Sequence, residues 1–192
     1  MENKNSTFKE FVSPILVLVI ICFVVTFLLA FTYGITAPII KTNTEKAASV
    51  ARSEILESAD GEFEAYTGDL LVQEEGKVSV EDCYVATNGT GMVVTVESSS
   101  YGGPLKAMIG IDKDGAISSV KVTEHSDTPG VGTKAQSVNH LAQYNGLSKL
   151  TAYEVKQDTE VNAVTGATIS SGAVHRAVFC ALEQFKAMGG VK

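Results

Sequence analysis

Cysteine is scarce in this sequence of 192 residues, and its three cysteines, Cys22, Cys83 and Cys180, lie far apart. None of them has the spacing to other cysteines or to histidines that is typical of a metal site. Cys22 lies inside a long apolar run, so only the other two could form a disulfide, and two isolated buried thiols are the simpler interpretation. The chain is therefore not expected to hold an iron–sulfur cluster by itself. Any redox group must be organic or belong to a partner.

Basic residues and catalytic motifs are also scarce. The chain has 15 Lys and Arg residues against 22 Asp and Glu residues, which gives a formal net charge of −7. Nucleic acid is not an expected partner, because binding to a phosphate backbone requires a concentrated basic surface. The three histidines, His125, His140 and His175, belong to no HExxH or Gly-x-Ser-x-Gly motif. We therefore predict no catalytic residue and no metal site.

One long apolar run lies near the N-terminus. Residues 15–31 are apolar except for Thr26, and with their flanks they exceed the ~20 residues that a membrane-spanning helix needs. The apolar part of a cleaved signal peptide is shorter, about 7–15 residues. We predict a polar N-terminus over residues 1–10 and a single transmembrane helix over residues 11–37. Charges flank this helix on both sides, so the positive-inside rule does not decide its orientation.

Residues 38–82 are predicted to link this helix to a domain. Apolar and charged residues mix at helical spacing over residues 39–59, and Gly61 is expected to end the helix. Acidic residues then dominate, with Lys77 the only basic residue among residues 54–82. Such a segment is typical of a solvated surface first and of an interaction surface second.

The remainder, residues 83–192, is predicted to be a small α+β domain with an antiparallel sheet and flanking helices. Short segments rich in β-branched and apolar residues alternate with turn sequences that contain Asn-Gly or Asp-Gly. The predicted strands are residues 83–87, 92–96, 105–111 and 117–123. Beyond them, the pattern predicts a short helix at 134–144 and an edge strand around Tyr153 and Val155.

The stretch before the last predicted helix has the composition of an anion-binding loop. Gly166 and the alanine after it remove side chains from the backbone, which leaves Thr168 as an accessible hydroxyl. From Ser170 onward apolar residues recur at three- and four-residue steps, with His175 among the polar residues between them, and Ser170 or Ser171 is a natural N-cap. A phosphate could bind at the free N–H groups of this helix start. The alternative is a loop and a capped helix without a ligand.

A second loop has a composition that no regular element would accommodate. His125 follows the last predicted strand, and Pro129, Gly130 and Gly132 come soon after it. Loops at the ends of strands commonly bind ligands. The alternative is a long turn with a solvent-exposed histidine.

The two loops resemble segments of a known family. The sequence Thr165-Gly166-Ala167-Thr168-Ile169-Ser170-Ser171 resembles the flavin-attachment motif of the FMN-binding domain in the G subunit of Rnf-type ion-translocating electron-transport complexes. It is similar, less closely, to the C subunit of the Na+-translocating NADH:quinone reductase. Residues 101–105, 109–112 and 124–132 resemble other family segments in the same order, which makes the match more specific than any one motif.

The resemblance implies a covalent flavin. The second threonine of the motif, here Thr168, would carry FMN through a phosphoester bond, and the Thr-Pro-Gly loop would lie against the flavin. The cofactor site would comprise Thr165, Gly166, Ala167, Thr168, Ser170, Thr128, Pro129, Gly130, Gly132 and His125. Two positions depart from the family pattern, because Asn162 stands where an aspartate is usual and Asp127 where a glutamate is more usual.

The resemblance also implies a role and partners. The chain would be the single-pass flavoprotein subunit of a membrane complex that passes electrons between ferredoxin and NAD and moves Na+ or H+. Its partners would be the other membrane subunits and a flavin-attaching transferase, and its FMN-binding domain would lie on the extracytoplasmic side of the cell membrane. No complete activity is expected of the chain alone. The alternatives are a component like the C subunit of the NADH:quinone reductase and a membrane-tethered binding module without flavin.

Overall fold

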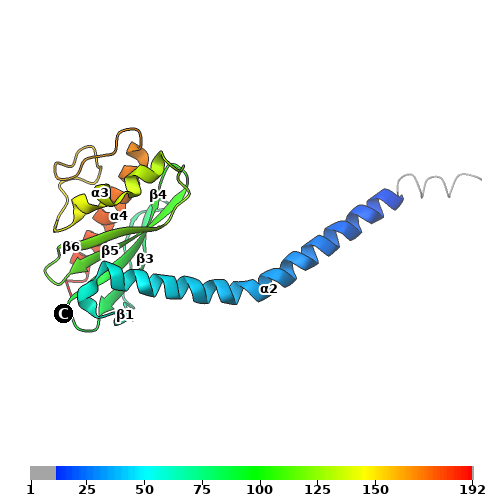
Figure 1. The fold of residues 1–192 in the computed structure, drawn as a ribbon, viewed down its shortest axis with the longest axis horizontal. Coiled ribbons are helices and arrows are strands. Elements are labelled where there is room, and N and C mark those ends of the chain that lie inside the picture. Colours follow the sequence, from blue (N-terminus) through cyan, green and yellow to red (C-terminus); the bar gives the residue numbers. More distant parts are fainter. Residues whose placement is uncertain (1–11, 192) are drawn as a thin grey trace, which may run out of the picture. The chain divides into compact units, whose positions relative to one another are not determined.

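The computed structural model describes residues 12–191, so the predicted polar N-terminus at residues 1–10 lies outside the described range. The chain divides into two compact units, one up to Ala48 and one from Ser49 onward. The first unit is most of one long helix, and the second contains a six-stranded sheet with the remaining helices (Figure 1).

The long helix α2 (Ser13–Ile55) is continuous over 43 residues, although the sequence predicts two helices that meet at Pro38. Proline removes one intrahelical hydrogen bond, but the chain remains helical both before and after Pro38. Thr26 and Thr32 each donate a hydrogen bond of 2.7 Å to the carbonyl four residues earlier, so these hydroxyls need no other partner. Within residues 12–191, α2 is the one helix long and apolar enough to cross a membrane. A short turn, η2 (Glu57–Ala59), follows it.

The sheet is antiparallel, with strand order β1-β3-β4-β5-β6, and β2 also pairs with β3. The strands are β1 (Phe63–Ala65), β2 (Val72–Glu74), β3 (Val78–Ala86), β4 (Gly91–Ser99), β5 (Pro104–Asp112) and β6 (Ile117–Glu124). The last four confirm the predicted strands, each of them longer at one or both ends. The predicted α+β fold with an antiparallel sheet is therefore confirmed.

Part of the segment predicted to be an acidic linker belongs to the sheet. Both β1 and β2 pair with β3, for example Phe63 with Ala86 and Val72 with Ser79. Strands of three residues show too little alternation to be recognised in a sequence. The second compact unit consequently begins at Ser49, well before the predicted start of the domain at residue 83.

Both faces of the sheet are covered. One face packs on α4 (Thr168–Ala187), and the core between them includes Met92, Val94, Val96, Ile109, Val174, Ala177, Val178 and Ala181. On the other face, the end of α2 packs so closely that a Cβ on Gly110 would lie 2.6 Å from Cγ2 of Ile55. The guanidinium of Arg52 lies 3.9 Å from the centre of the Tyr84 ring on β3. Because both faces are covered, β4 is buried almost throughout.

The apolar face predicted for α4 is confirmed, but its polar side is more buried than predicted. His175 has no exposed surface, although the pattern places it among the polar residues. Its Nε2–H donates a 2.9 Å hydrogen bond to the carbonyl of Ala152, so the loop that contains this residue covers the helix there. Gln184 is also buried, because it bonds to the backbone of Asp69 and Leu71.

Two further predictions differ from the structure. Residues 132–144 form three short pieces, η3 (Gly132–Gln136), α3 (Val138–Leu141) and η4 (Ala142–Tyr144), where one helix is predicted from residue 134. The predicted edge strand around Tyr153 and Val155 is wrong. The carboxylate of Asp158 accepts hydrogen bonds of 2.7–3.2 Å from the N–H groups of Thr151, Ala152, Glu160 and Val161. These N–H groups therefore bond to one carboxylate, and not to the carbonyl groups of a neighbouring strand.

Candidate functional site

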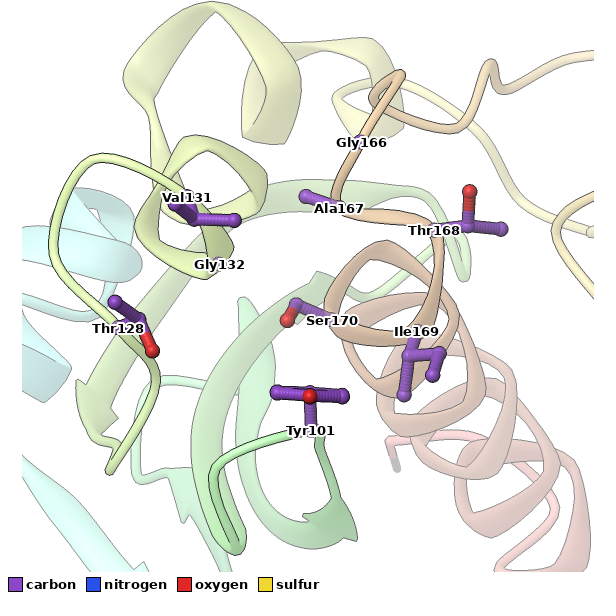
Figure 2. Close-up of a pocket in the computed structure, with 9 residues that line it drawn as sticks. All are labelled: Tyr101, Thr128, Val131, Gly132, Gly166, Ala167, Thr168, Ile169 and Ser170. Carbon is purple, nitrogen blue, oxygen red and sulfur yellow. The ribbon is translucent and has the colours of Figure 1, made fainter.

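A pocket of about 440 Å³ lies at the start of α4. Three chain segments form it: the turn after β4, the loop after β6, and the loop that leads into α4 (Figure 2). The lining residues are Tyr101, Thr128, Val131, Gly132, Gly166, Ala167, Thr168, Ile169 and Ser170. Its volume lies within the range of small-molecule and cofactor sites, about 300–1,000 Å³.

The start of α4 presents unpaired N–H groups at this pocket. The predicted N-cap at Ser170 or Ser171 is wrong, because α4 begins at Thr168 with Ala167 in the cap position and no side-chain cap. The first backbone hydrogen bond of the helix runs from Ser171 N to Ala167 O, at 2.8 Å. The N–H groups of Thr168, Ile169 and Ser170 come before it and have no partner within the helix. This arrangement suits an anion.

The hydroxyl of Ser171 bonds to the loop before α4 and does not cap the helix. This hydroxyl donates to the carbonyl of Ala167 at 3.0 Å and accepts from the N–H of Val164 at 3.0 Å. These two bonds hold the loop against the first turn of the helix. Gly166 adopts a left-handed conformation, with φ of 81°, which favours glycine at this turn.

Thr168 lies at the rim of the pocket. In Figure 2 its side chain points away from Thr128 and Val131 on the opposite wall. The residue is partly buried, and its hydroxyl makes no hydrogen bond within the described range. A group attached to this hydroxyl could therefore form without breaking an existing bond.

The opposite wall is a loop folded around the carbonyl of Thr128. This oxygen accepts hydrogen bonds from the N–H groups of Val131 at 3.2 Å and Gly132 at 3.1 Å. Gly130 has φ of 75°, and its N–H donates to the hydroxyl of Thr133 at 2.9 Å. The Thr-Pro-Gly loop thus has a fixed shape and faces the start of α4 (Figure 2).

The structure brings most of the predicted site residues together. Six of them line the pocket: Thr128, Gly132, Gly166, Ala167, Thr168 and Ser170. Thr165, Pro129 and Gly130 lie in the same two loops, exposed and outside the lining. His125 is exposed and lines a separate shallow pocket with Pro104, Thr123, Glu124 and Ser126.

Three lining residues are missing from the predicted site. Tyr101, Val131 and Ile169 are 75%, 51% and 55% exposed, respectively. An aromatic ring and two aliphatic side chains around a polar loop form apolar walls for a flat ligand. The signal that could have identified them is their position, since each lies beside a glycine-containing or threonine-containing motif that the sequence analysis singles out.

A buried polar cluster lies behind the loop that leads into the site. Because His175 donates through Nε2, its Nδ1 accepts, and the hydroxyl of Tyr144 lies 3.4 Å away. Gln143 donates to Nδ1 of His140 at 2.9 Å, so Nε2 of His140 carries a proton and is buried without a partner among the described residues. Burial lowers the pKa of both histidines, and the hydrogen bond to Ala152 and the carboxylate of Asp158 only partly oppose this for His175.

Comparison with known proteins shows which domain and which relatives the chain is similar to. The profile of the FMN-binding domain matches residues 100–183, which include every residue that lines the pocket. The G subunit of the ion-translocating oxidoreductase complex of Methanosarcina acetivorans is 31% identical over 185 residues, covering 95% of this chain and 98% of that protein. The G subunit of the proton-translocating ferredoxin:NAD(+) oxidoreductase complex of Clostridium ljungdahlii is 29% identical over 181 residues, 91% of each chain.

Among solved structures, one match to this chain is NqrC of Shewanella oneidensis. It is 22% identical in sequence and covers 55% of this chain and 57% of its own, with a TM-score of 0.44. The sequence similarity to the Methanosarcina protein, by contrast, extends over almost the full length of both chains. The chain therefore belongs to the family of G subunits of ion-translocating oxidoreductase complexes.

Proposed function

We propose that this chain is the membrane-anchored flavoprotein subunit of an ion-translocating ferredoxin:NAD oxidoreductase complex, and that it carries FMN esterified to Thr168. The observation that carries the proposal is the position of Thr168. It is the first residue of α4 and lies at the rim of the pocket, beside N–H groups that have no partner in the helix. A phosphoester on its hydroxyl keeps a negative charge, which the helix start stabilises.

The remaining lining residues fit the ring system of FMN. Tyr101, Val131 and Ile169 supply apolar walls at the mouth of the pocket, and Gly132 and Gly166 bring bare backbone close to the ligand. The isoalloxazine ring of FMN accepts and donates electrons when it is bound. The protein would hold the ring, orient it and limit its contact with water.

The membrane anchor in this proposal is the apolar part of α2, predicted at residues 11–37. The N-terminus would lie in the cytoplasm and the FMN-binding domain on the extracytoplasmic side. A covalent link is useful there, since a dissociated cofactor would be lost by dilution. The other membrane subunits of the complex and a flavin-attaching transferase are the partners that this role requires.

The proposal is tested by replacing two threonines of one loop. Thr168→Ala, Thr165→Ala and the wild type are co-expressed with the flavin-attaching transferase, and the denatured protein bands are examined for flavin fluorescence. Thr165 is the matched control, because it is exposed, lies three residues away and does not line the pocket. We expect fluorescence from the wild type and Thr165→Ala and none from Thr168→Ala.

Stability separates loss of attachment from loss of fold. The hydroxyl of Thr168 makes no hydrogen bond within residues 12–191, so its removal should change the free energy of unfolding by no more than about 0.5 kcal/mol. Equal fluorescence of Thr168→Ala and the wild type would contradict the attachment site. Absence of fluorescence from all three proteins would favour a binding module without covalent flavin.

A further inference from the structure

Asp127 is a buried carboxylate that lies directly behind the pocket lining. It is 4% exposed and is not itself a lining residue. The hydroxyl of Ser100 lies 2.9 Å from its Oδ1 and 2.7 Å from its Oδ2, and the N–H of Gly102 donates to Oδ1 at 3.0 Å. The side-chain amide of Gln136 donates to Oδ2 at 3.4 Å. One carboxylate therefore accepts hydrogen bonds from three residues in two separate segments of the chain.

These donors belong to two walls of the pocket. Ser100 and Gly102 are the neighbours of Tyr101, which forms one wall. Asp127 itself precedes Thr128 in the loop of the facing wall, and Gln136 ends the short helix that follows this loop. Among the described residues, no other hydrogen bond joins residues 100–103 to residues 125–136. Asp127 therefore makes the hydrogen-bonded connection between these two segments, beside the pairing of β5 with β6, for example Lys106 with Glu124, next to them.

Asp127 packs closely against residues that line the pocket. A Cβ on Gly132 would lie 2.8 Å from Cβ of Asp127 and 2.9 Å from Oγ of Ser170, and both Gly132 and Ser170 line the pocket. A Cβ on Gly102 would lie 2.1 Å from the backbone oxygen of Ser126. A side chain at Gly132 would collide with the side chains of Asp127 and Ser170, and one at Gly102 with the backbone of Ser126. A shift of Asp127 must therefore move lining atoms.

We propose that Asp127 is a positioning residue for the flavin site, which ties the turn of Tyr101 to the Thr-Pro-Gly loop and so forms the pocket before the ligand binds. The inference rests on the proposed function for the identity of the ligand, but the tie itself belongs to the flavin-free protein. A pocket that is already formed binds its ligand without the cost of ordering two loops. Attachment at Thr168 also requires the ligand in a defined position.

The variants follow from the atoms involved. Asp127→Ala leaves the Ser100 hydroxyl and the Gly102 N–H without their acceptor, so both loops should loosen. Asp127→Asn keeps Oδ1 for Gly102, and its amide can pair with Ser100 and with a reoriented Gln136, so it should restore the tie. The control is Asp112→Ala, which removes a carboxylate that accepts from Asp114 and Ala116 at 2.9 Å in a hairpin turn outside the pocket.

Hydrogen exchange on the full-length, flavin-free chain in detergent tests the tie. We expect Asp127→Ala to speed exchange about tenfold or more in both segments, 100–103 and 127–136, and Asp127→Asn to stay near the wild type. Asp112→Ala should speed exchange only around residues 112–116. Faster exchange in one wall alone, or in neither, would overturn the proposal.

Flavin incorporation then tests the consequence for the site. In the presence of the flavin-attaching transferase, Asp127→Ala should acquire flavin about tenfold more slowly than the wild type, while Asp127→Asn and Asp112→Ala keep the wild-type rate. Equal rates for Asp127→Ala and the wild type would overturn the positioning role. If the wild type acquires no flavin, the proposed function fails, whereas the exchange result still decides whether Asp127 ties the walls.

Discussion

Thr168 differs from the other hydroxyl residues of its loop in what surrounds it. Ser171 is fully buried and uses its hydroxyl to hold the loop. Ser170 is 1% exposed and packs against Gly132, and Thr165 is exposed but lies outside the pocket lining. Thr168 alone among these four combines a free hydroxyl, partial exposure and a place at the rim. This combination explains why one threonine, and not its neighbours, would be modified.

Asn162 provides a residue-scale prediction about the transferase. Its side chain is exposed and makes no hydrogen bond in the described part of the chain, while its N–H donates to Gln143 at 3.0 Å. Asn162→Asp should therefore change stability by no more than about 0.5 kcal/mol. If the transferase reads the carboxylate that the family usually has there, the flavin-bearing fraction should rise.

The intact mass of Asn162→Asp and of the wild type, each expressed with limiting transferase, gives this fraction. Asn162→Gln is the matched control, since it alters the side chain without adding a charge. An equal flavin-bearing fraction in all three proteins would mean that the enzyme does not read this position.

At the scale of elements, buried histidines tie the last helix to the loops around it. His175 on α4 bonds to Ala152 and lies beside Tyr144 of η4, while Asp158 and Glu154 face it from the loop. Burial lowers the pKa of His175, as it does for His140. Both rings therefore bind fewer protons in the folded chain than in the unfolded chain, whose histidines have an ordinary pKa of about 6.5.

The expected result is a loss of stability in acid. Below about pH 6.5 the unfolded state binds more protons at these histidines than the folded state does, so the free energy of unfolding falls as the pH falls. Urea unfolding between pH 7.5 and 5 measures this slope. His175→Gln should flatten it, because the amide can still donate to Ala152 but does not titrate. A slope that is the same in His175→Gln and the wild type would contradict the role of His175 and assign the acid sensitivity to His140 or to carboxylates instead.

The helices and strands that the sequence predicts correctly are those whose spacing of apolar residues continues over many positions. The strands β3 to β6 and the apolar face of α4 repeat over eight residues or more, and all were predicted. The three-residue strands β1 and β2 were not, because their pairing with β3 decides their structure. The environment of His175 was also missed, since a covering loop without regular structure leaves no periodic signal.

For the site, sequence motifs predicted the glycine and threonine positions of the two loops, but they did not predict the apolar side chains that line the pocket. The glycine and threonine positions of both loops could be named, because close approach and a free hydroxyl are properties of residue type. Tyr101, Val131 and Ile169 depend on how three segments meet in space. For the same reason His125, adjacent in sequence to the Thr-Pro-Gly loop, lies in a different depression of the surface.

At the scale of the whole molecule, the compact unit that starts at Ser49 sets the boundary of the folding domain. Ala51, Ile55 and Leu56 are buried in it, as is Val93 of β4. A fragment of residues 49–192 should therefore unfold cooperatively. A fragment of residues 83–192 lacks β1, β2, the first part of β3 and the end of α2, exposes one face of the sheet, and should show no cooperative transition.

Thermal unfolding followed by circular dichroism compares these two fragments. The longer fragment needs no membrane segment and provides a soluble form for the experiments on acid stability. Cooperative unfolding of the shorter fragment with the same midpoint would contradict the assigned boundary.

The most direct test of flavin attachment at Thr168 is peptide mass spectrometry of the chain isolated from membranes that contain the transferase. Cleavage after Lys156 and Arg176 releases residues 157–176, which contain both Thr165 and Thr168. We predict that this peptide carries the added mass of esterified FMN and that its fragment ions assign the addition to Thr168. An unmodified peptide, or an addition assigned to Thr165 or a serine, would contradict the account.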